Sequence, residues 1–564
     1  MNNFNIKLPD DVQFIIHTLQ LHGFEAYAVG GCVRDSILGR EPGDWDITTS
    51  AMPEETKALF DKTFDTGIEH GTITVLLNHE GYEVTTYRID GKYEDSRHPK
   101  EVTFTRNLKE DLLRRDFTIN AMAYNDKDGI VDIFGGMQDL EKHMIRCVGN
   151  ARERFSEDAL RILRGVRFAA QLGFEIDEET KEGMKLLAPT LENISAERIQ
   201  VELVKMLTSD RPELIRTAYE LGITKVFLPE FDRMMETKQE TLHHMYTVGE
   251  HTIHAMMNVR NDKILRLTML LHDTGKPEYK TMDEDGVAHF KMHALGSERI
   301  AKEVLRRLKF DNDTLHKVTR LVLNHDYRMP AVPKNVRRAM NKIGEDIFPY
   351  YMEVRRADVL AQSEYQRAEK LKNLDEVEQT YAEIIEKNSG LLLNLFNDIL
   401  DLSALEAGSL KFSIGSVRMR DICARLYHQY CDSVHPGVIL VFDEVDPDLC
   451  VQGDWDRISQ IWLNLLSNAI KFTSEGEIHF GFERKGGMIQ GYVSDTGIGI
   501  PVERAATIFS RFGKVNDFVQ GTGLGLTICR MLVEKMGGRI WVRSKVGAGT
   551  IFYFTLPMVC KTKG

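Results

Sequence analysis

The chain of 564 residues is too long for a single hydrophobic core, and its length predicts about three to five domains. Hydrophobic residues make up 42% and charged residues 28%, as in ordinary globular proteins, so an enzyme, a signalling protein or a scaffold remain open. The net charge of −13 excludes a general attraction to nucleic acid. RNA binding therefore needs local basic clusters, and two are present: Arg114 with Arg115, and Arg161 with Arg164 and Arg167.

Nothing in the sequence indicates a membrane or an oxidising compartment. No apolar stretch is long enough to cross a bilayer, and the N-terminal MNNFNIKLPDDVQ lacks the regions of a signal peptide. The seven cysteines are scattered, odd in number and form no CxxC pair, which favours reduced thiols over a disulfide framework or a zinc ribbon. We therefore expect a cytoplasmic protein with no membrane partner.

The predicted elements change character along the chain. Residues 1–150 mix short β-rich runs (73–77, 82–89 and 101–105) with helical segments, which predicts a small α/β domain. From about 151 to 387 apolar residues recur at helical spacing. Residues 366–401 contain no proline and predict one long connecting helix or coiled-coil arm. After about 412 strands and helices alternate again, which predicts a second α/β domain.

The first candidate site begins at a pair of glycines. They follow an apolar run and precede a helix-like segment, so backbone N–H groups and a helix N-terminus favour a phosphate there. A DxD motif follows; if it lies on a strand, both carboxylates leave one face and suit Mg²⁺, which bridges phosphates and activates a hydroxyl. Either motif alone is more often an ordinary turn, but their close succession favours a site. The residues are Gly30, Gly31, Arg34, Asp35, Asp44 and Asp46.

These motifs resemble those of the nucleotidyltransferase superfamily, and specifically the bacterial class II CCA-adding enzymes and their poly(A) polymerase relatives, over roughly residues 10–387. The resemblance implies that Glu83 is a third carboxylate and that residues 90–101 form the family's mobile loop. The segment Asp111-Leu-Leu-Arg-Arg-Asp-Phe-Thr-Ile-Asn-Ala-Met matches the motif between head and neck. There the resemblance implies that the sugar and triphosphate are held by Arg115, Asp116 and Asn120.

Glu157-Asp158-Ala-Leu-Arg161 resembles the family's base-selecting motif. Asp158 and Arg161 are three residues apart, so on one helix they share a face. Aspartate only accepts hydrogen bonds and arginine only donates them. Cytosine and adenine both offer an exocyclic amine beside a ring acceptor, so this pair would select CTP and ATP and reject uracil and guanine. The alternative is an ordinary surface ion pair.

A third motif set lies between residues 251 and 358. His251, His272-Asp273 and Asp358 follow the order of the HD metal-dependent phosphohydrolases. His293 and His325 are further candidate ligands. Histidine and aspartate together suit a transition metal. A vestigial helical domain that no longer binds metal is an equal alternative.

Four later motifs resemble, in order and spacing, the N, G1, F and G2 boxes of histidine-kinase catalytic domains. Physical chemistry gives each a role: an asparagine oxygen for Mg²⁺, an aspartate that accepts from the adenine amino group, and glycines that let turns and a lid approach ATP. The N box supplies Asn464, Asn468 and Lys471, the G1 box Asp495, Gly497 and Gly499, the F box Phe509 and Phe512, and the G2 box Gly521, Gly523 and Gly525.

Residues 388–412 resemble the second helix of the kinase dimerisation hairpin, which implies a homodimer; a response regulator is a partner only of the parent kinase. The family's phosphate-accepting histidine lies on the first hairpin helix, in a pattern such as H-E-x-R-T-P. The lookalike His325-Asp-Tyr-Arg-Met-Pro330 lies further upstream than the resemblance implies and inside the HD segment. We interpret it as a coincidence.

The two resemblances meet near 387–388 within one predicted helix, which favours an engineered chimera over a natural fusion. The expected function is tRNA CCA addition with CTP, ATP and Mg²⁺, joined to a histidine-kinase ATP-binding domain without its acceptor histidine. The alternatives are an ATP-binding signalling module on a nucleotidyltransferase scaffold, or poly(A) polymerase-like activity. The expected fold is multidomain: an α/β nucleotidyltransferase head (1–150), an all-α neck (151–240), a helical body with an HD-like motif (241–387), the second hairpin helix (388–411) and an α/β sandwich of the histidine-kinase ATPase type (412–564).

Overall fold

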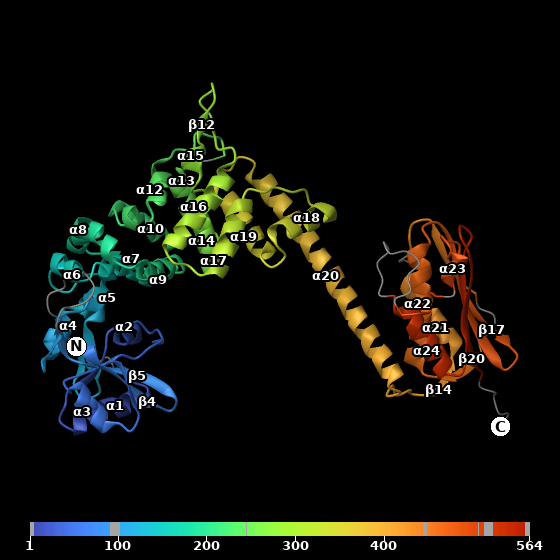
Figure 1. Cartoon of the computed structure of the whole chain (residues 1–564), viewed down its shortest axis with the longest axis horizontal. Coiled ribbons are helices and arrows are strands. Elements are labelled where there is room, and N and C mark those ends of the chain that lie inside the picture. The colour runs from blue at the N-terminus through green and yellow to red at the C-terminus, as the bar shows by residue number, and fades with distance from the viewer. Residues whose placement is uncertain are drawn as a thin grey trace. The chain divides into compact units, whose positions relative to one another are not determined.

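The computed structural model describes residues 5–90, 102–243, 245–431, 434–443, 448–505, 507–511 and 523–558. The chain divides into two compact units, Met1–Ala382 and Glu383–Gly564 (Figure 1). The multidomain architecture predicted from the sequence is confirmed: an α/β head and a helical region precede a C-terminal α/β domain. No helix among the described residues is long and apolar enough to span a membrane.

The first unit begins with a seven-stranded sheet in the order β3-β4-β5-β2-β1-β8-β9. All neighbours pair antiparallel except β2 and β5, which are parallel. The helix α1 packs on this sheet because its buried residues Val12, Ile15, Ile16 and Leu19 recur at helical spacing. The bounds are α1 (Asp10–Leu21), β1 (Ala26–Val29), α2 (Gly31–Ile37), β2 (Ile47–Thr49), α3 (Pro53–Leu59), β3 (Thr63–Gly67), β4 (Thr72–Leu77), β5 (Glu80–Thr86), β8 (Met122–Asn125) and β9 (Gly129–Asp132).

The predicted strand 82–89 is interrupted at Tyr87, where the chain leaves the large sheet for a second ribbon of β6 (Arg88–Asp90) and β7 (Val102–Phe104). The Tyr87 side chain is fully buried, and its burial in the core between the two sheets accounts for the break. A 3₁₀ turn at Ile68–His70 joins β3 to β4. The connection to the neck contains the 3₁₀ turn Thr118–Asn120, α4 (Leu108–Leu113), α5 (Gly136–Glu141), and the short parallel pair β10 (Met144–Ile145) and β11 (Glu175–Ile176).

Residues 151–382 are almost wholly helical, as the sequence predicts. The exceptions are β11 and a small hairpin of β12 (Thr281–Met282) and β13 (Ala288–His289). The neck helices are α6 (Ala151–Glu157), α7 (Leu160–Leu172), α8 (Glu178–Leu187), α9 (Ala196–Leu207), α10 (Ile215–Glu220), α11 (Thr224–Phe227) and α12 (Pro229–Glu236), with 3₁₀ turns at Ala188–Asn193 and Pro212–Leu214. The body helices are α13 (Val248–Met257), α14 (Lys263–Leu271), α15 (Lys276–Tyr279), α16 (His293–Arg307), α17 (Asn312–Asn324), α18 (Pro333–Ile343) and α19 (Phe348–Ala361).

The predicted long helix is present as α20 (Arg367–Glu406), 40 residues without a break. The boundary between the two units falls inside it, after Ala382. Residues such as Leu374 and Val377 belong to the first unit and are buried, whereas Leu405 belongs to the core of the second.

The second unit is a five-stranded sheet in the order β15-β17-β18-β20-β19 with helices packed on it (Figure 1). The β15–β17 pair is parallel and the others are antiparallel. Trp462 of α22 lies at the centre of the core, edge-on to Phe480 and Phe554. The bounds are β14 (Gly415–Arg418), α21 (Met419–Tyr430), β15 (Val438–Asp443), β16 (Cys450–Gly453), α22 (Trp455–Phe472), β17 (Gly476–Lys485), β18 (Met488–Asp495), α23 (Val502–Ala505), α24 (Gly525–Lys535), β19 (Ile540–Lys545) and β20 (Gly549–Pro557).

Candidate functional sites

The DxD carboxylates lie just before β2, and the expectation that both stand on a strand is wrong. The strand begins at Ile47, and Asp44 and Asp46 belong to the segment that leads into it. The Asp46 carbonyl still accepts a hydrogen bond from the Val29 N–H of β1 (2.9 Å), which holds the segment beside the sheet. Desolvation raises the pKa of Asp46, Arg115 opposes it and Asp44 raises it further. The two carboxylates are therefore close enough to repel each other, which a divalent cation would relieve.

Glu83 lies in the middle of the neighbouring strand β5, beside the start of β2. Ile47 of β2 pairs with Val84 of β5 in parallel register. Asp46 immediately precedes β2 and Glu83 lies on β5, and each comes one residue before one of these partners, so they take adjacent positions and leave the face opposite to Ile47 and Val84. Glu83 is exposed, as are both aspartates. Three carboxylates thus gather at one solvent-accessible edge.

The glycine pair forms the turn that starts α2. Gly30 has φ +86°, a conformation that favours glycine, and a Cβ there would come within 3.0 Å of the Arg115 Nη1. Gly31 is the first residue of α2, so its N–H belongs to the exposed end of the helix. Arg115 also contacts the buried carboxylate of Asp111 (3.5 Å). The turn, Arg115 and the Asp46 carboxylate therefore surround one small region.

Arg34 starts a buried polar network behind this turn. Its guanidinium donates to both carboxylate oxygens of Asp35 (2.8 Å each) and to the Asn120 Oδ1 (2.6 Å). Asn120 in turn donates to the Asp116 Oδ1 (3.1 Å). The sequence-predicted residues on α2 and on the segment after α4 are thus brought together by direct hydrogen bonds.

Asp116 is the anionic centre of this network. Its second oxygen accepts from Arg164 Nε (2.8 Å), and its first also accepts from the Phe117 N–H (2.8 Å). Burial would raise the pKa of Asp116, but Arg164, Asn120 and the Phe117 N–H hold it at about 2. The sequence placed Arg164 only in a basic cluster; its pairing with a residue 48 positions upstream has no sequence signal.

Asp158 and Arg161 do not share a helix face, and this expectation is also wrong. Asp158 ends α6 with φ −136° and ψ 102°, and α7 begins only at Leu160. The pair therefore stands across a helix junction. Asp158 binds Arg198 Nη2 (2.9 Å), while Arg161 binds the Glu157 carboxylate (2.7 Å) and the Arg114 carbonyl (2.7 Å). The alternative reading, a direct Asp158–Arg161 ion pair, is not among the described ion pairs either.

Three guanidiniums surround the ring of Phe168, a feature that sequence reasoning missed. Those of Arg34, Arg164 and Arg167 lie 5.1, 5.4 and 3.7 Å from the ring centroid. Arg167 also pairs with the buried Glu202 (2.6 Å). The arginines of the second basic cluster thus make contacts inside the protein, beside the Asp116 network.

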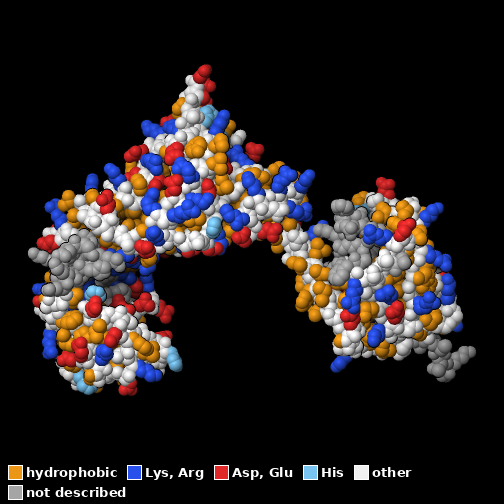
Figure 2. All heavy atoms as spheres, viewed as in Figure 1, with side chains coloured by type: hydrophobic (Ala, Val, Ile, Leu, Met, Phe, Trp, Pro, Cys, Tyr) orange, Lys and Arg blue, Asp and Glu red, His pale blue; other side chains and the backbone are white. Residues whose placement is uncertain are grey.

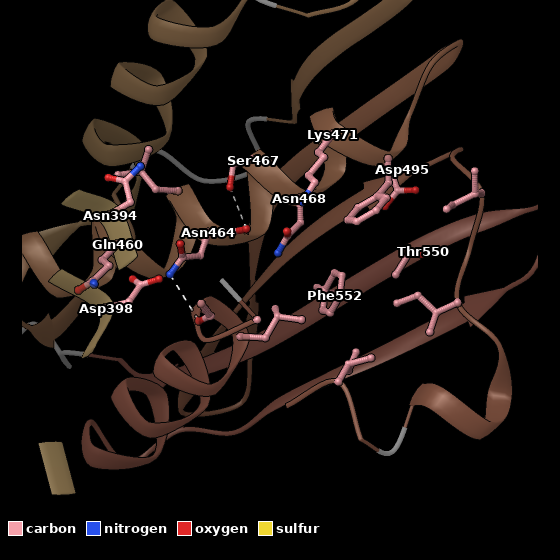
Figure 3. Close-up of a pocket in the computed structure, with 18 of the residues that line it drawn as sticks. Asn394, Asp398, Gln460, Asn464, Ser467, Asn468, Lys471, Asp495, Thr550 and Phe552 are labelled. Atoms are coloured by element: carbon pink, nitrogen blue, oxygen red, sulfur yellow. Dashed lines mark hydrogen bonds between the residues drawn. The ribbon is translucent and has the colours of Figure 1, made fainter. Parts of the chain in front are cut away.

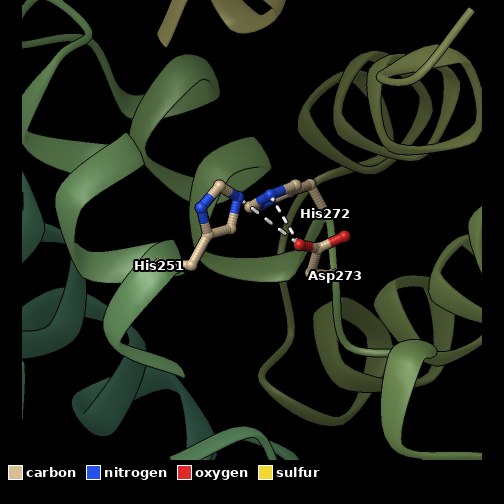
Figure 4. A group of neighbouring side chains, drawn as sticks. All are labelled: His251, His272 and Asp273. Carbon is tan, nitrogen blue, oxygen red and sulfur yellow. Dashed lines mark ion pairs between the residues drawn. The ribbon is translucent and has the colours of Figure 1, made fainter. Parts of the chain in front are cut away.

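The six HD-motif residues come together in the helical body. His251 Nε2 lies 3.0 Å from the Asp358 Oδ1 and 3.6 Å from the Asp273 Oδ2. His272 Nε2 is 3.1 Å from the same Asp273 oxygen (Figure 4). The other Asp273 oxygen, Oδ1, lies 3.3 Å from His293 Nε2 and 3.5 Å from His325 Nε2. Two groups with metal-ligand spacing therefore share Asp273: one with His251 and His272, one with His293 and His325.

The histidine tautomers favour cation binding at this cluster. The Nδ1 atoms of all four rings face backbone carbonyls, those of Ala361, Met269, Phe290 and Val322, at 2.7–3.3 Å. A carbonyl only accepts, so each Nδ1 carries a proton; in a ring with no second proton, the Nε2 lone pair then faces the interior of the cluster. Two of these lone-pair atoms, on His293 and His325, are only 3.1 Å apart. The donor set therefore fits one or two cations.

A lysine already neutralises part of this cluster. Lys276 Nζ lies 2.7 Å from the Asp273 Oδ2 and is itself buried. Burial would raise the pKa of Asp273, but His272 and Lys276 hold it well below its usual range. The i,i+3 spacing of Asp273 and Lys276 on adjoining turns was a sequence signal that could have identified this contact.

The second unit contains a cavity of about 580 Å³ between α22, α24, the sheet and the second-unit part of α20 (Figure 3). Asn464, Asn468 and Lys471 line it because their spacing of four and three residues puts them on one face of α22. The opposite face of the helix carries the buried core residues. A volume of this size fits a nucleotide.

Asp495 is the last residue of β18 and lines this cavity. Burial raises its pKa, whereas backbone N–H donors oppose the rise; one is Gly497, 2.9 Å from its Oδ1. A Cβ at Gly497 would lie 2.3 Å from the Phe472 carbonyl oxygen, and one at Gly499 (φ +71°) 2.2 Å from the Lys545 carbonyl oxygen. Only glycine fits either position, so this turn is built tightly against the cavity.

The remaining box residues are only partly described. Gly523 and Gly525 line the cavity, and Asn464 donates to the Gly525 carbonyl (3.4 Å). Phe509 is buried edge-on to Phe552. Phe512 and Gly521, and all but the first residue of the predicted mobile loop 90–101, lie outside the described residues.

Sequence reasoning missed the contribution of α20 to this cavity. Leu391, Asn394, Asn397 and Asp398 line it. Further along the helix, Asp401 binds Arg457 (2.9 Å) and so fastens α20 to α22. The helix was predicted, but which of its polar residues face the catalytic domain depends on how it packs.

Comparison with known families identifies four segments. Residues 26–146 match the poly A polymerase head domain, and residues 173–235 match the family described as "Probable RNA and SrmB- binding site of polymerase A". Residues 241–363 match the HD domain. Residues 453–559 match the histidine kinase-, DNA gyrase B-, and HSP90-like ATPase family.

Curated relatives resemble the N-terminal part of the chain. The CCA-adding enzyme of Limosilactobacillus reuteri is 54% identical over 198 residues, which are 35% of this chain and 49% of that protein. The CCA-adding enzyme of Enterococcus faecalis is 55% identical over 193 residues, 34% and 48% of the two chains. That of Bacillus cytotoxicus is 51% identical over 214 residues, 38% and 53%. The chain thus spans about half the length of these relatives.

Solved structures resemble both parts. The Bacillus stearothermophilus CCA-adding enzyme in complex with CTP matches with a TM-score of 0.47 and 28% identity, over 67% of this chain and 83% of that one. Full-length ShkA in complex with AMPPNP matches with a TM-score of 0.30 and 28% identity, over 32% and 39%. From the family matches, the chain contains a poly(A) polymerase-type head, an HD domain and an ATPase domain of the histidine-kinase, gyrase B and Hsp90 type.

Proposed function

We propose that the first unit adds C and A to the 3′ end of tRNA, using CTP and ATP. The observation that carries this proposal is the edge at which Asp44, Asp46 and Glu83 meet the glycine turn of α2 and Arg115. Carboxylates beside a helix N-terminus and a guanidinium are the groups that phosphoryl transfer requires. The high identity to curated CCA-adding enzymes supports the same substrate class.

The three carboxylates would hold divalent cations, with Mg²⁺ as the natural choice for an all-oxygen site. Such a cation, when bound, neutralises the triphosphate and favours ionisation of the attacking hydroxyl. The protein itself would supply orientation: the N–H of Gly31 and the Arg115 guanidinium would face the phosphates, and the Arg34–Asn120–Asp116 network would fix the sugar side of the site.

The base would be selected by Asp158 and Arg161 beside the Arg198 and Glu157 partners that hold them now. The aspartate would accept from the exocyclic amine and the arginine would donate to the ring nitrogen of cytosine or adenine. Each would give up one protein partner when the base binds. In the absence of a nucleotide, the protein partners therefore keep both side chains hydrogen-bonded. Local basic residues, rather than the acidic chain as a whole, would bind the tRNA.

The test incubates the full chain with tRNA that lacks its CCA end and with each labelled nucleoside triphosphate in turn. Incorporation of C, and of A only after C, supports the proposal. Long runs of A with no C would indicate poly(A) polymerase-like activity instead. Asp46→Ala should abolish incorporation while Asp61→Ala, an exposed aspartate outside the site, should not; near-normal activity of the Asp46 variant would exclude its role.

A second candidate function is ATP binding by the second unit, supported by the cavity of about 580 Å³ that Asn464, Asn468, Lys471 and Asp495 line. We propose a histidine-kinase-type module in which Asp495 accepts from the adenine amino group and Asn468 ligates Mg²⁺. Phosphoryl transfer needs an acceptor in line with the γ-phosphate. The His325 ring is held in the HD cluster by the Val322 carbonyl and His293, so it does not serve as that acceptor.

The HD cluster would bind a transition metal through the inward lone pairs of its four histidines and through Asp273 and Asp358. Histidine nitrogens favour such metals over Mg²⁺. The Lys276 ammonium shares Asp273 and would compete with the cation or be displaced by it. A phosphoester-hydrolysing activity is the chemistry that such a site supports.

We also propose a homodimer through α20. Large apolar side chains are exposed along its second-unit part (Figure 2), namely Ile385, Leu392, Leu393, Phe396, Ile399 and Leu400. Their positions fall on one side of the helix, away from Leu395, Leu402 and Leu405, which pack on the ATP-binding domain. A second copy of the same helix is the partner that such a surface fits. Light scattering of the full chain and of Leu393→Lys tests it: a monomer in the unmutated protein contradicts the proposal.

A further inference from the structure

The first unit has a cavity that neither proposed activity uses. It has a volume of about 300 Å³ and lies between residues 327–329, α19 and the beginning of α20. Its lining includes three cations, Arg328, Arg355 and Lys370, and a single carboxylate, Glu369. None of the six HD-cluster residues lines it.

Of the three cations of this cavity, only Arg355 has an anionic partner among the described ion pairs. Arg355 is only 6% exposed; its Nη1 donates to the His325 carbonyl (2.9 Å) and to the Asp358 Oδ2 (3.1 Å). Its buried Nε has no hydrogen-bond partner within the described part of the chain. A buried donor without an acceptor is costly unless a ligand or water supplies one.

Lys370 and Arg328 add to this excess of positive charge. Lys370 Nζ contacts only neutral groups, the Gln362 Oε1 (2.8 Å) and the His243 Nδ1 (3.2 Å), in the hydrogen bonds described for it. Neither Lys370 nor Arg328 takes part in an ion pair between described residues. Burial lowers the pKa of Lys370 and the charge of Arg328 lowers it further; Asp358 opposes this shift and Arg355 adds to it, so the three cations lie close enough to repel one another. An anion among them would relieve this repulsion.

The other lining residues are mostly apolar or aromatic. They include Tyr327 and Tyr351 and the buried Met329 and Met352. The Tyr351 hydroxyl donates to the Tyr327 carbonyl (2.6 Å), and Lys342 Nζ lies 4.1 Å from the centre of the Tyr327 ring, so both contacts restrain the segment that carries Tyr327. A cavity that combines three cations with tyrosine and methionine side chains fits a ligand that joins a phosphate to a flat ring.

We propose that this cavity binds a phosphorylated ligand of mononucleotide size, with its phosphate between Arg328, Arg355 and Lys370 and its ring against Tyr327 and Met329. The site is separate from the transferase edge and from the ATP cavity. Because Arg355 also holds Asp358, the ligand would contact the residue that braces one ligand of the HD cluster.

Hydrogen exchange of the full chain tests this site locally, with AMP, adenosine and inorganic phosphate as probes. EDTA is present throughout, so that the two cation-dependent nucleotide sites are not loaded. AMP should slow exchange in peptides covering 324–332 and 364–378. In Arg328→Gln and Lys370→Gln the AMP concentration for half-maximal protection should rise about tenfold or more. Lys372→Gln, an exposed lysine on the same helix outside the cavity lining, is the matched control and should behave as the unmutated protein.

The outcomes are distinct. Protection by AMP that both cavity variants weaken and the control keeps supports the proposal, provided that the variants melt at the temperature of the unmutated protein. No protection by AMP, or protection that survives both substitutions, overturns it. Equal protection by adenosine overturns the role of the phosphate, and equal protection by inorganic phosphate overturns the role of the ring.

Discussion

Replacing Arg164 with glutamine removes the cation that pairs with the buried Asp116. The pKa of Asp116 is held at about 2, below its usual 3.8, and the carboxyl is only 7% exposed. At about 1.4 kcal/mol for each tenfold change in the ionisation constant, this stabilises the folded protein by about 2 kcal/mol at neutral pH. Because the folded-state pKa is depressed, the stabilisation is present above pH 3.8 and is lost as the pH falls through about 2.

A double-mutant cycle measures this pairing in the full chain. Hydrogen exchange of peptides covering residues 112–121 gives the local opening free energy, which avoids assuming that a multidomain protein unfolds in one step. Arg164→Gln alone should lower it by up to about 2 kcal/mol, since only the hydrogen bonds from Asn120 and the Phe117 N–H then oppose the desolvation of Asp116. Asp116→Asn with Arg164→Gln should lose less than the sum of the two single changes, whereas Arg152→Gln, an exposed arginine of α6, should have no effect.

The same variants report on the transferase site. Asp116 positions Asn120, which positions Arg34, so Arg164→Gln should also slow nucleotide addition although Arg164 touches none of the catalytic carboxylates in the contacts described. A coupling energy below about 0.5 kcal/mol between Asp116 and Arg164 would refute the reasoning, because it would mean that solvent screens the pair despite its burial.

Four further experiments test the other sites. Arg161→Ala should weaken the preference for CTP and ATP over UTP and GTP by about tenfold or more, and an undiminished preference would exclude Arg161 as a base selector. Added Co²⁺ should raise the melting temperature of the metal-free chain, because the cation binds only the folded HD cluster, and Asp273→Asn should remove this effect; equal stabilisation of both would place the metal elsewhere. Asp495→Ala should weaken Mg-ATP binding to the second unit about tenfold or more, measured with the head inactivated by Asp46→Ala. With γ-labelled Mg-ATP the unmutated chain should acquire no acid-labile, base-stable label, and label that disappears in His325→Ala would identify the acceptor that we exclude.

The fold was largely predictable because its signals are local. Helical spacing and the absence of proline predicted α20, and β-rich runs predicted β4, β5 and β7. The break at Tyr87 was not predictable, since a buried tyrosine at the joint of two sheets looks like any other strand residue. The helix end at Asp158 was missed for a similar reason: no glycine or proline marks it, and its extended backbone is accompanied by the bond from Asp158 to Arg198 of another helix.

The candidate sites were predictable to the extent that their motifs name the residues. The N-box residues lie together because their spacing puts them on one face of α22, whereas the HD histidines come from separate helices and are brought together by the packing of the helical body. Their partners were not predictable. Lys276 at Asp273, Arg164 at Asp116 and Arg198 at Asp158 are all set by tertiary packing, and these partners determine the charge of each site.

The apolar run of α20 shows why composition alone does not predict which side of a helix packs on its own domain and which side stays exposed. From Leu391 to Leu405 nearly every turn carries two or three large apolar residues, more than one packing surface can cover. Leu395, Leu402 and Leu405 meet the core of the ATP-binding domain, and Asp401 fixes this face through Arg457. The remaining apolar residues, such as Phe396, are left exposed on the other side. Exposed apolar residues at helical spacing are commonly covered by a partner, so we expect this side of α20 to be buried, and self-association, as proposed above, needs no other protein.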